Sequence, residues 1–329
     1  MELQELVKLH RNCGYKIHEV HGCYFYSRWI RGNLYPLNSS FPDNYLISID
    51  KSLVNALKWR FLVSPVLINA QKKDRYEFVL TTDQYELEQF DRKVRNRIKK
   101  SLQTCKFIRP SLEDLLRDGL VINQQSCKRQ LRKDNLLTNK KLWDKYITSI
   151  YNSSEFIIWG AYFEDRLVGY LIIYELEGKF NMLQAFINRN NSSFTNPMCG
   201  LIYTAVNSLI NEHGKISISY GIHRESKPSS LTSFKKHMFF EARALSSAQI
   251  VNPVFLFFVK LVVFITIKLL HRKSIKYQWL KKALYLYQGH RRLLTELHRI
   301  QKPVSQNNMF QISASSFSRA TKFQSITSQ

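Results

Sequence analysis

Apolar residues in the middle of the chain form three short runs that end at turns. The runs are rich in β-branched and aromatic side chains, which favour strands. They cover Phe156–Tyr162, Leu167–Tyr174 and Phe180–Asn188. Glu164-Asp165-Arg166 separates the first two and Gly178 precedes the third. The pattern predicts three consecutive antiparallel strands.

The apolar spacing then changes to that of a helix and back again. A helix is expected from Pro197 to about Glu212, with proline near its start and Gly214 just past its end. A strand over Ile216–Tyr220, a helix over Leu231–Phe239 and an extended segment over Ala242–Val251 follow. Three antiparallel strands, helix, strand, helix, strand is the order of an α+β domain.

A second patterned region lies upstream. Residues 76–80 read as a strand, and Thr82-Asp83 is suited to cap a helix that runs through the basic segment 91–100. Helical spacing is kept by Tyr85, Leu87, Phe90, Val94 and Ile98. Lys93, Arg97 and Lys100 are separated by four and three residues, so a helix would place them on one face. Such a face either binds an anion or is simply exposed to solvent.

Charge and cysteine content narrow the class of protein. The 329 residues suggest two domains, and the net charge of +24 is typical of proteins that meet nucleic acid, nucleotide-linked substrates or anionic lipid. Five cysteines in no paired spacing predict reduced thiols in the cytoplasm. With nine scattered histidines they form no zinc motif, and no metal is expected.

The C-terminal region combines an apolar stretch with concentrated positive charge. Residues 252–329 hold 13 Lys/Arg against the single acid Glu296, a net +12 that is half of the chain's excess. Residues 254–270 contain only two charged side chains, Lys260 and Lys268. The stretch is shorter than the about 20 apolar residues that a membrane span needs. This helix either lies peripherally on an anionic membrane surface, through residues 254–292, or caps the preceding domain. Residues 303–329 are expected to be disordered.

Three passages together resemble the GNAT acyltransferase superfamily, and more closely its Fem-type (FemAB-like) aminoacyltransferases. They are the strand and basic helix over 76–101, the hairpin at 159–169, and Leu231–Phe240, which is similar to the family pattern L-x-x-F-K-x-x-x-G-F. The resemblance covers residues 76–250, about half of the chain. It implies tandem GNAT-like folds with mixed central sheets flanked by helices, the first of them degenerate.

The resemblance also implies a domain plan and a mechanism. The expected units are a degenerate domain at 1–101, a helical connection at 102–150, an acyltransferase domain at 151–251, a basic helical extension at 252–302 and the tail at 303–329. The acyl donor would lie where the parallel strands 180–188 and 216–220 splay apart. Lys235 matches the Fem-type lysine near the donor's carbonyl or phosphate, with Phe234 as its packing anchor, although a solvated helix lysine is the alternative.

Further residues are candidates for substrate binding. The basic face (Lys93, Arg97 and Lys100) is one candidate, and Gly200 is another, at the end of the segment 189–200 that stands where relatives have their phosphate-binding loop. His223 is either a proton acceptor just beyond a strand or a loop or core histidine. The segment 189–200 lacks the paired glycines of coenzyme A-binding relatives. The tyrosine that usually acts as general acid in GNAT enzymes also has no candidate, because no tyrosine occurs from 221 to 245.

These departures leave two functions open. One is an acyl- or aminoacyltransferase that modifies an amine of a cell-envelope or polysaccharide precursor. Its donor would be acyl-CoA or aminoacyl-tRNA, and tRNA would then be a partner. The other is a non-enzymatic protein with a decayed transferase fold that binds nucleic acid or anionic lipid through its basic surfaces.

Overall fold

The computed structural model describes most of the chain, and its elements follow the expected α+β order. The described residues are 3–20, 23–27, 33–37, 55, 62–68, 75–131, 134–176, 178–188, 195–224, 230–269, 286–291 and 293–295. The predictions for residues 303–329 lie outside them.

The strands are β1 (Lys16–Val20), β2 (Cys23–Ser27), β3 (Asn33–Pro36), β4 (Leu62–Ile68), β5 (Arg75–Thr82), β6 (Lys106–Ile108), β7 (Phe156–Phe163), β8 (Arg166–Leu176), β9 (Lys179–Ile187), β10 (Ile216–Arg224) and β11 (Glu241–Val251). The helices are α1 (Leu3–Asn12), η2 (Leu87–Gln89), α3 (Arg92–Thr104), α4 (Leu112–Asp114), η3 (Leu115–Gly119), α5 (Leu120–Arg129), α6 (Asn135–Thr138), α7 (Lys140–Tyr151), α8 (Pro197–His213), α9 (Ser230–His237) and α10 (Pro253–Leu269).

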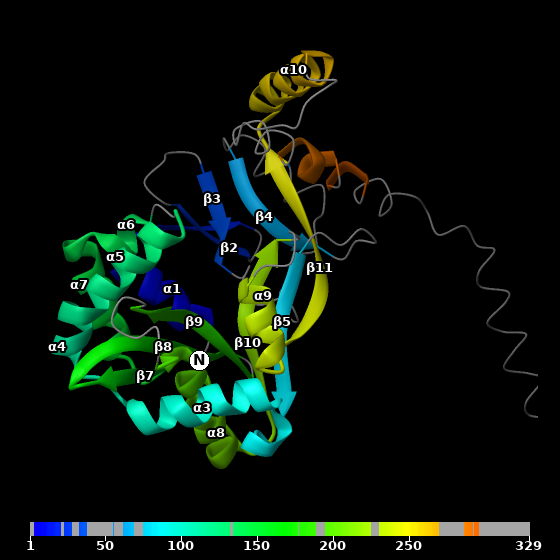
Figure 1. Ribbon diagram of the computed structural model, residues 1–329. Coiled ribbons are helices and arrows are strands. Elements are labelled where there is room, and N and C mark those ends of the chain that lie inside the picture. Colours follow the sequence, from blue (N-terminus) through cyan, green and yellow to red (C-terminus); the bar gives the residue numbers. More distant parts are fainter. Residues whose placement is uncertain are drawn as a thin grey trace, which may run out of the picture.

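One continuous mixed sheet organises the molecule (Figure 1). Its strand order is β1-β2-β3-β4-β11-β5-β10-β9-β8-β7-β6. β11 connects the two parts, because its first half pairs with β5 and its second half with β4. The β7-β8-β9 meander is antiparallel, as predicted. β5 comes from the expected first domain but lies between β10 and β11, so the boundary at residue 101 stays a prediction.

Helices cover both faces of the sheet and enclose two cores. α3 and α8 lie on one face (Figure 1) and bury Val94, Ile98 and Leu201 in what we call the α8-side core. α1, α5 and α7 cover the other face, where Trp143 is fully buried. Both faces of the central strands are therefore apolar, which explains why β8 is buried along almost its whole length.

The basic helix begins later than the sequence predicts. Asp91, not Thr82-Asp83, is the N-cap of α3, and its side chain accepts a hydrogen bond from the Val94 N–H at 2.9 Å. The preceding residues form the short helix η2 instead. There Tyr85 and Phe90 pack edge to face, with ring centroids 5.1 Å apart, so their helical spacing reflects an aromatic cluster.

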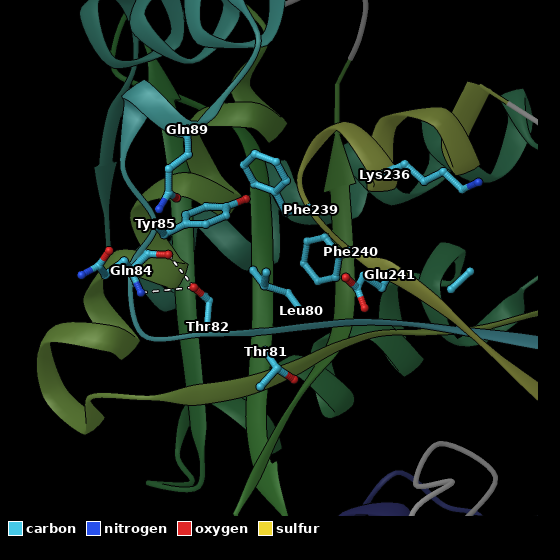
Figure 2. A pocket seen from close by; sticks show the side chains of 11 residues that line it. Leu80, Thr81, Thr82, Gln84, Tyr85, Gln89, Lys236, Phe239, Phe240 and Glu241 are labelled. Atoms are coloured by element: carbon cyan, nitrogen blue, oxygen red, sulfur yellow. Dashed lines mark hydrogen bonds between the residues drawn. The ribbon is translucent and has the colours of Figure 1, made fainter.

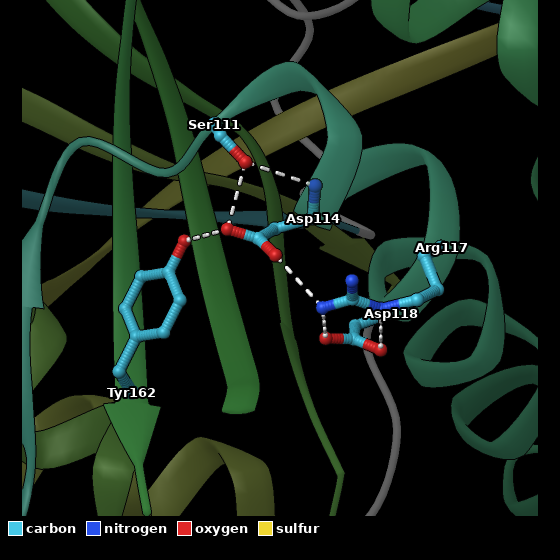
Figure 3. A network of polar contacts seen from close by, with 5 residues as sticks. All are labelled: Ser111, Asp114, Arg117, Asp118 and Tyr162. Atoms are coloured by element: carbon cyan, nitrogen blue, oxygen red, sulfur yellow. Dashed lines mark hydrogen bonds and ion pairs between the residues drawn. The ribbon is translucent and has the colours of Figure 1, made fainter. Parts of the chain in front are cut away.

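A polar network fixes the connecting helices to the sheet (Figure 3). Ser111 caps α4, since its hydroxyl accepts from the Asp114 N–H. The Asp114 carboxylate accepts from the Tyr162 hydroxyl on β7 at 2.8 Å and pairs with Arg117. Arg117 also pairs with Asp118. These contacts hold the connecting helices against β7 of the antiparallel meander.

The apolar C-terminal segment forms α10, as expected, at the end of the molecule away from α3 and α8 (Figure 1). Within the described residues, we find no helix with the length and apolar character that crossing a bilayer requires.

Candidate functional site

Strands β9 and β10 run parallel and separate after a short ladder. Phe180 lies opposite Ile218 and Asn181 opposite Ser219. Beyond this point β9 stays paired with β8, and β10 stays paired with β5. The splayed pair that the resemblance implies is thereby confirmed.

A bulge in β10 marks the point of separation. The register of β10 on β5 shifts between Ser219 and Ile222, so Tyr220 and Gly221 form the bulge. Gly221 has φ +84°, a conformation that suits glycine, and its N–H donates to the Ser219 hydroxyl at 3.1 Å. The bulge interrupts the ladder at Tyr220, so the carbonyl of this residue can accept a hydrogen bond from a side chain.

Lys235 supplies that side chain from α9. Its Nζ donates to the Tyr220 carbonyl at 3.0 Å and lies 4.0 Å from the centroid of the Tyr220 ring. The Phe78 ring centroid is 4.9 Å away. Lys235 is 0% exposed, so the interpretation of this residue as a solvated helix lysine is wrong. The amine is buried against the bulge at which the two strands part.

Burial changes the acid–base behaviour of this lysine. Loss of hydration disfavours the charged amine and lowers the pKa of Lys235 to about 7. At neutral pH the protonated and neutral forms are then both populated. A bound anion would favour the protonated form, so Lys235 is suited to respond to an anionic ligand or to charge that develops on an oxygen.

The end of α9 fixes the backbone of Lys235. The Phe240 N–H donates to the Lys235 carbonyl and the Phe239 N–H donates to the Lys236 carbonyl, both at 3.0 Å, which is the Schellman pattern of helix ends. Phe239 adopts φ +61°, at the position where the family pattern has glycine. Phe234, the expected anchor, is half-buried and packs against the α8-side core.

The predicted basic face exists on α3. Lys93, Arg97 and Lys100 are exposed, whereas Val94, Ile98 and Ser101 on the neighbouring side of the helix are buried. This face points outward, so it is separate from the buried amine of Lys235. Its role in binding stays a prediction.

Gly200 lies where α8 crosses α3. A Cβ at this position would be 2.2 Å from Phe107 Cζ and 2.5 Å from Ser101 Oγ. Close helix packing is sufficient to require glycine there, and a role in substrate binding stays untested. His223 lies within β10 opposite Tyr76, because the strand continues to Arg224 rather than ending at Tyr220.

An open cavity of about 750 Å³ lies at the C-terminal end of α9, and the sequence did not predict it. The end of β5, the beginning of β11 and Lys236 line it (Figure 2). Tyr85 and Phe239 form its aromatic wall, and the Tyr85 hydroxyl donates to the Met238 carbonyl. Phe239 is 39% exposed in a left-handed conformation, but nothing in the sequence indicated this strain.

The sequence also did not predict a buried ion pair on β5, next to the residue that contacts Lys235. Glu77 is 0% exposed and its Oε1 accepts from Lys179 Nζ at 2.9 Å. Its neighbour Phe78 contacts Lys235, so strand alternation puts the carboxylate on the opposite face of β5. A lone acid between Tyr76 and Phe78 was the signal in the sequence that could have identified it.

Comparisons with known proteins support the fold. No family model and no curated protein matches the chain. Among solved structures, FemX is similar with a TM-score of 0.53 and 11% identity, over 78% of this chain and 93% of FemX. The C-terminal domain of a putative lysylphosphatidylglycerol synthetase from Agrobacterium fabrum has a TM-score of 0.49 and 9% identity, over 80% of this chain and 92% of that chain. The L-PGS of Bacillus licheniformis has a TM-score of 0.49 and 12% identity, over 74% and 90%. The protein therefore has the FemAB-like, tandem GNAT fold, as its motif order predicts.

Proposed function

We propose that this protein transfers an acyl or aminoacyl group to an amine of a cell-envelope or polysaccharide precursor. The reaction would occur in the gap between β9 and β10, with Lys235 at the donor's carbonyl or phosphate. The observation that carries the proposal is the fully buried amine of Lys235 at the bulge where the parallel strands separate. Burying a lysine is costly, so a buried amine in this position supports a functional role.

Acyl transfer to an amine is favoured by a cation beside the carbonyl oxygen of the donor. A neutral amine attacks the donor carbonyl, the new N–C bond forms, and negative charge builds on the carbonyl oxygen. The bond from the carbonyl carbon to the leaving oxygen or sulfur then breaks, and the proton lost by the attacking amine neutralises the leaving group. A fixed donor near the developing oxyanion contributes about 10²–10³-fold to the rate.

Lys235 can provide such a donor. The ammonium donates to the Tyr220 carbonyl, which fixes its position. The Tyr220 and Phe78 rings restrict its position, so little rearrangement is needed when charge develops. A pKa near 7 makes this role dependent on pH, because only the protonated amine stabilises an anion.

Two features support an anionic donor. The N-terminus of α8 follows β9, in the position that favours a phosphate group, and Pro197 begins the helix. Arg97 on the basic face is close enough to α8 to oppose the rise in the pKa of Cys199 that burial causes. Both acyl-CoA and aminoacyl-tRNA carry phosphates, so these features do not choose between them.

Thermal-shift measurements with acyl-CoA thioesters, nucleotide sugars and aminoacyl-tRNA would identify the donor. Stabilisation by one class, absent in Lys235→Met and kept in Lys236→Met, supports the transferase. Lys236 is a matched control, since it is the exposed neighbour on the same helix. Binding of nucleic acid alone, without sequence preference and lost in salt, would instead support the non-enzymatic alternative.

A further inference from the structure

The outer side of α10 exposes a continuous apolar stripe. Val254 and Phe257 are each 64% exposed, Phe258 is 56% and Leu261 is 46%. Their spacing of three, one and three residues places all four within about 100° around the helix. Two exposed phenylalanines on one helix face are unusual for a surface that stays in water.

The opposite side of α10 is covered by protein. Leu256 is 8% exposed and Val259 is 5%, and both lie about half a turn from the apolar stripe. The inner side of α10 therefore packs on the protein, as the capping-helix alternative expects. That alternative does not explain why the outer side is apolar. One helix with two apolar sides needs a second apolar environment.

The beginning of α10 is fixed, so the stripe has a defined direction. The Asn252 side chain accepts from the Val254 N–H at 2.9 Å and the Asn252 carbonyl accepts from the Leu256 N–H at 2.8 Å. The buried end of β11, Val251, immediately precedes this cap. A surface that bound the stripe would therefore hold the whole molecule in one orientation.

Positive charge next to the stripe identifies the occupant. Lys260 is exposed about 60° from Phe257 around the helix, at the edge where an amine can reach out of an apolar layer. The sequence from 252 to 329 adds twelve more Lys/Arg and one acid. Apolar side chains bordered by lysine and arginine complement a bilayer with anionic headgroups.

We propose that the outer face of α10, formed by Val254, Phe257, Phe258 and Leu261, docks on an anionic lipid bilayer. The helix lies in the plane of the interface, with the two phenylalanines at the boundary between headgroups and acyl chains. Lys260 faces the headgroups, and the positive charge of the sequence that follows adds to the attraction. This inference is independent of the proposed transferase activity.

Vesicle co-sedimentation of the full chain tests the proposal. Phosphatidylcholine vesicles with and without phosphatidylglycerol are compared at low and high salt. Wild type should bind the anionic vesicles, and salt should weaken this binding. The double variant Phe257→Ser, Phe258→Ser should bind about tenfold less or weaker still. Val121→Ser, at a 43% exposed position on α5, is the matched control and should bind like wild type.

Circular dichroism melts establish that both variants fold. Equal binding of wild type and the double variant would overturn the proposal, as would equal binding to vesicles with and without phosphatidylglycerol. Self-association without vesicles that the double variant abolishes would assign the stripe to a second copy of the chain instead. Resistance of bound protein to both salt and alkaline carbonate would also contradict peripheral docking.

Discussion

Replacing Lys235 with methionine should remove a contribution to the stability of the protein that rises with pH. The lysine pKa falls from 10.5 in an exposed setting to about 7 in the folded protein. Between these values the unfolded chain binds one more proton than the folded chain. Lys235 should therefore contribute a rise of about 1.4 kcal/mol per pH unit, from pH 7 to pH 10, to the difference in the free energy of unfolding between the wild type and Lys235→Met.

The magnitude can be worked out from the structure. A shift of the pKa from 10.5 to about 7 lowers the free energy of unfolding at pH 7 and below by at most about 5 kcal/mol, compared with a side chain that carries no charge. The Tyr220 carbonyl and the two ring faces favour the charged amine and reduce this cost. Methionine removes the charge but leaves the carbonyl without this donor, at a cost of about 1–3 kcal/mol.

Lys235→Met should therefore be more stable than wild type near pH 6.5, and the difference should shrink or reverse near pH 10. Urea unfolding at several pH values, with Lys236→Met as the control, measures both slopes. Lys236→Met should follow the wild type because its side chain is exposed. Parallel pH profiles for wild type and Lys235→Met would refute the buried, low-pKa amine.

Three other substitutions or reactions test the surroundings of the site. Gly200→Ala should destabilise the protein by about 1–3 kcal/mol in thermal melts, because its Cβ would overlap Phe107, whereas Thr204→Ala on the same helix should change stability little. Phe239→Gly should be about 1 kcal/mol more stable than Phe239→Ala, since both lose the ring but only alanine keeps the left-handed strain. Burial raises the pKa of Cys13 to about 12 and that of Cys199 to about 11, so both thiols should resist a thiol-specific reagent at pH 8 until the protein is unfolded.

The sequence predicted those parts of the fold that depend on neighbouring residues. Short apolar runs and turns located β7, β8 and β9, and proline and glycine bracketed α8. The start of α3 was misplaced because Tyr85 and Phe90 keep helical spacing for a different reason, their packing in an aromatic cluster. Asp91 was an equally good cap, and only the structure shows that the helix begins there.

The site depends on contacts that are distant in sequence and could not be predicted in the same way. The motif located Lys235, but its burial requires a carbonyl 15 residues earlier and a ring on β5. The insertion of β5 between β10 and β11 creates that environment. Position along α9 alone is equally compatible with an exposed lysine, which is why both interpretations stayed open.

Transfer kinetics test the central claim, that the gap between β9 and β10 with its buried lysine is an acyl-transfer site. The donor found by thermal shift and an amine acceptor are mixed with wild type, Lys235→Met or Lys236→Met, and product is followed by mass spectrometry. We expect Lys235→Met to remain folded and to lose about 10²-fold or more in turnover, whereas the turnover of Lys236→Met should stay near that of the wild type. Turnover of Lys235→Met at the wild-type rate would contradict the account.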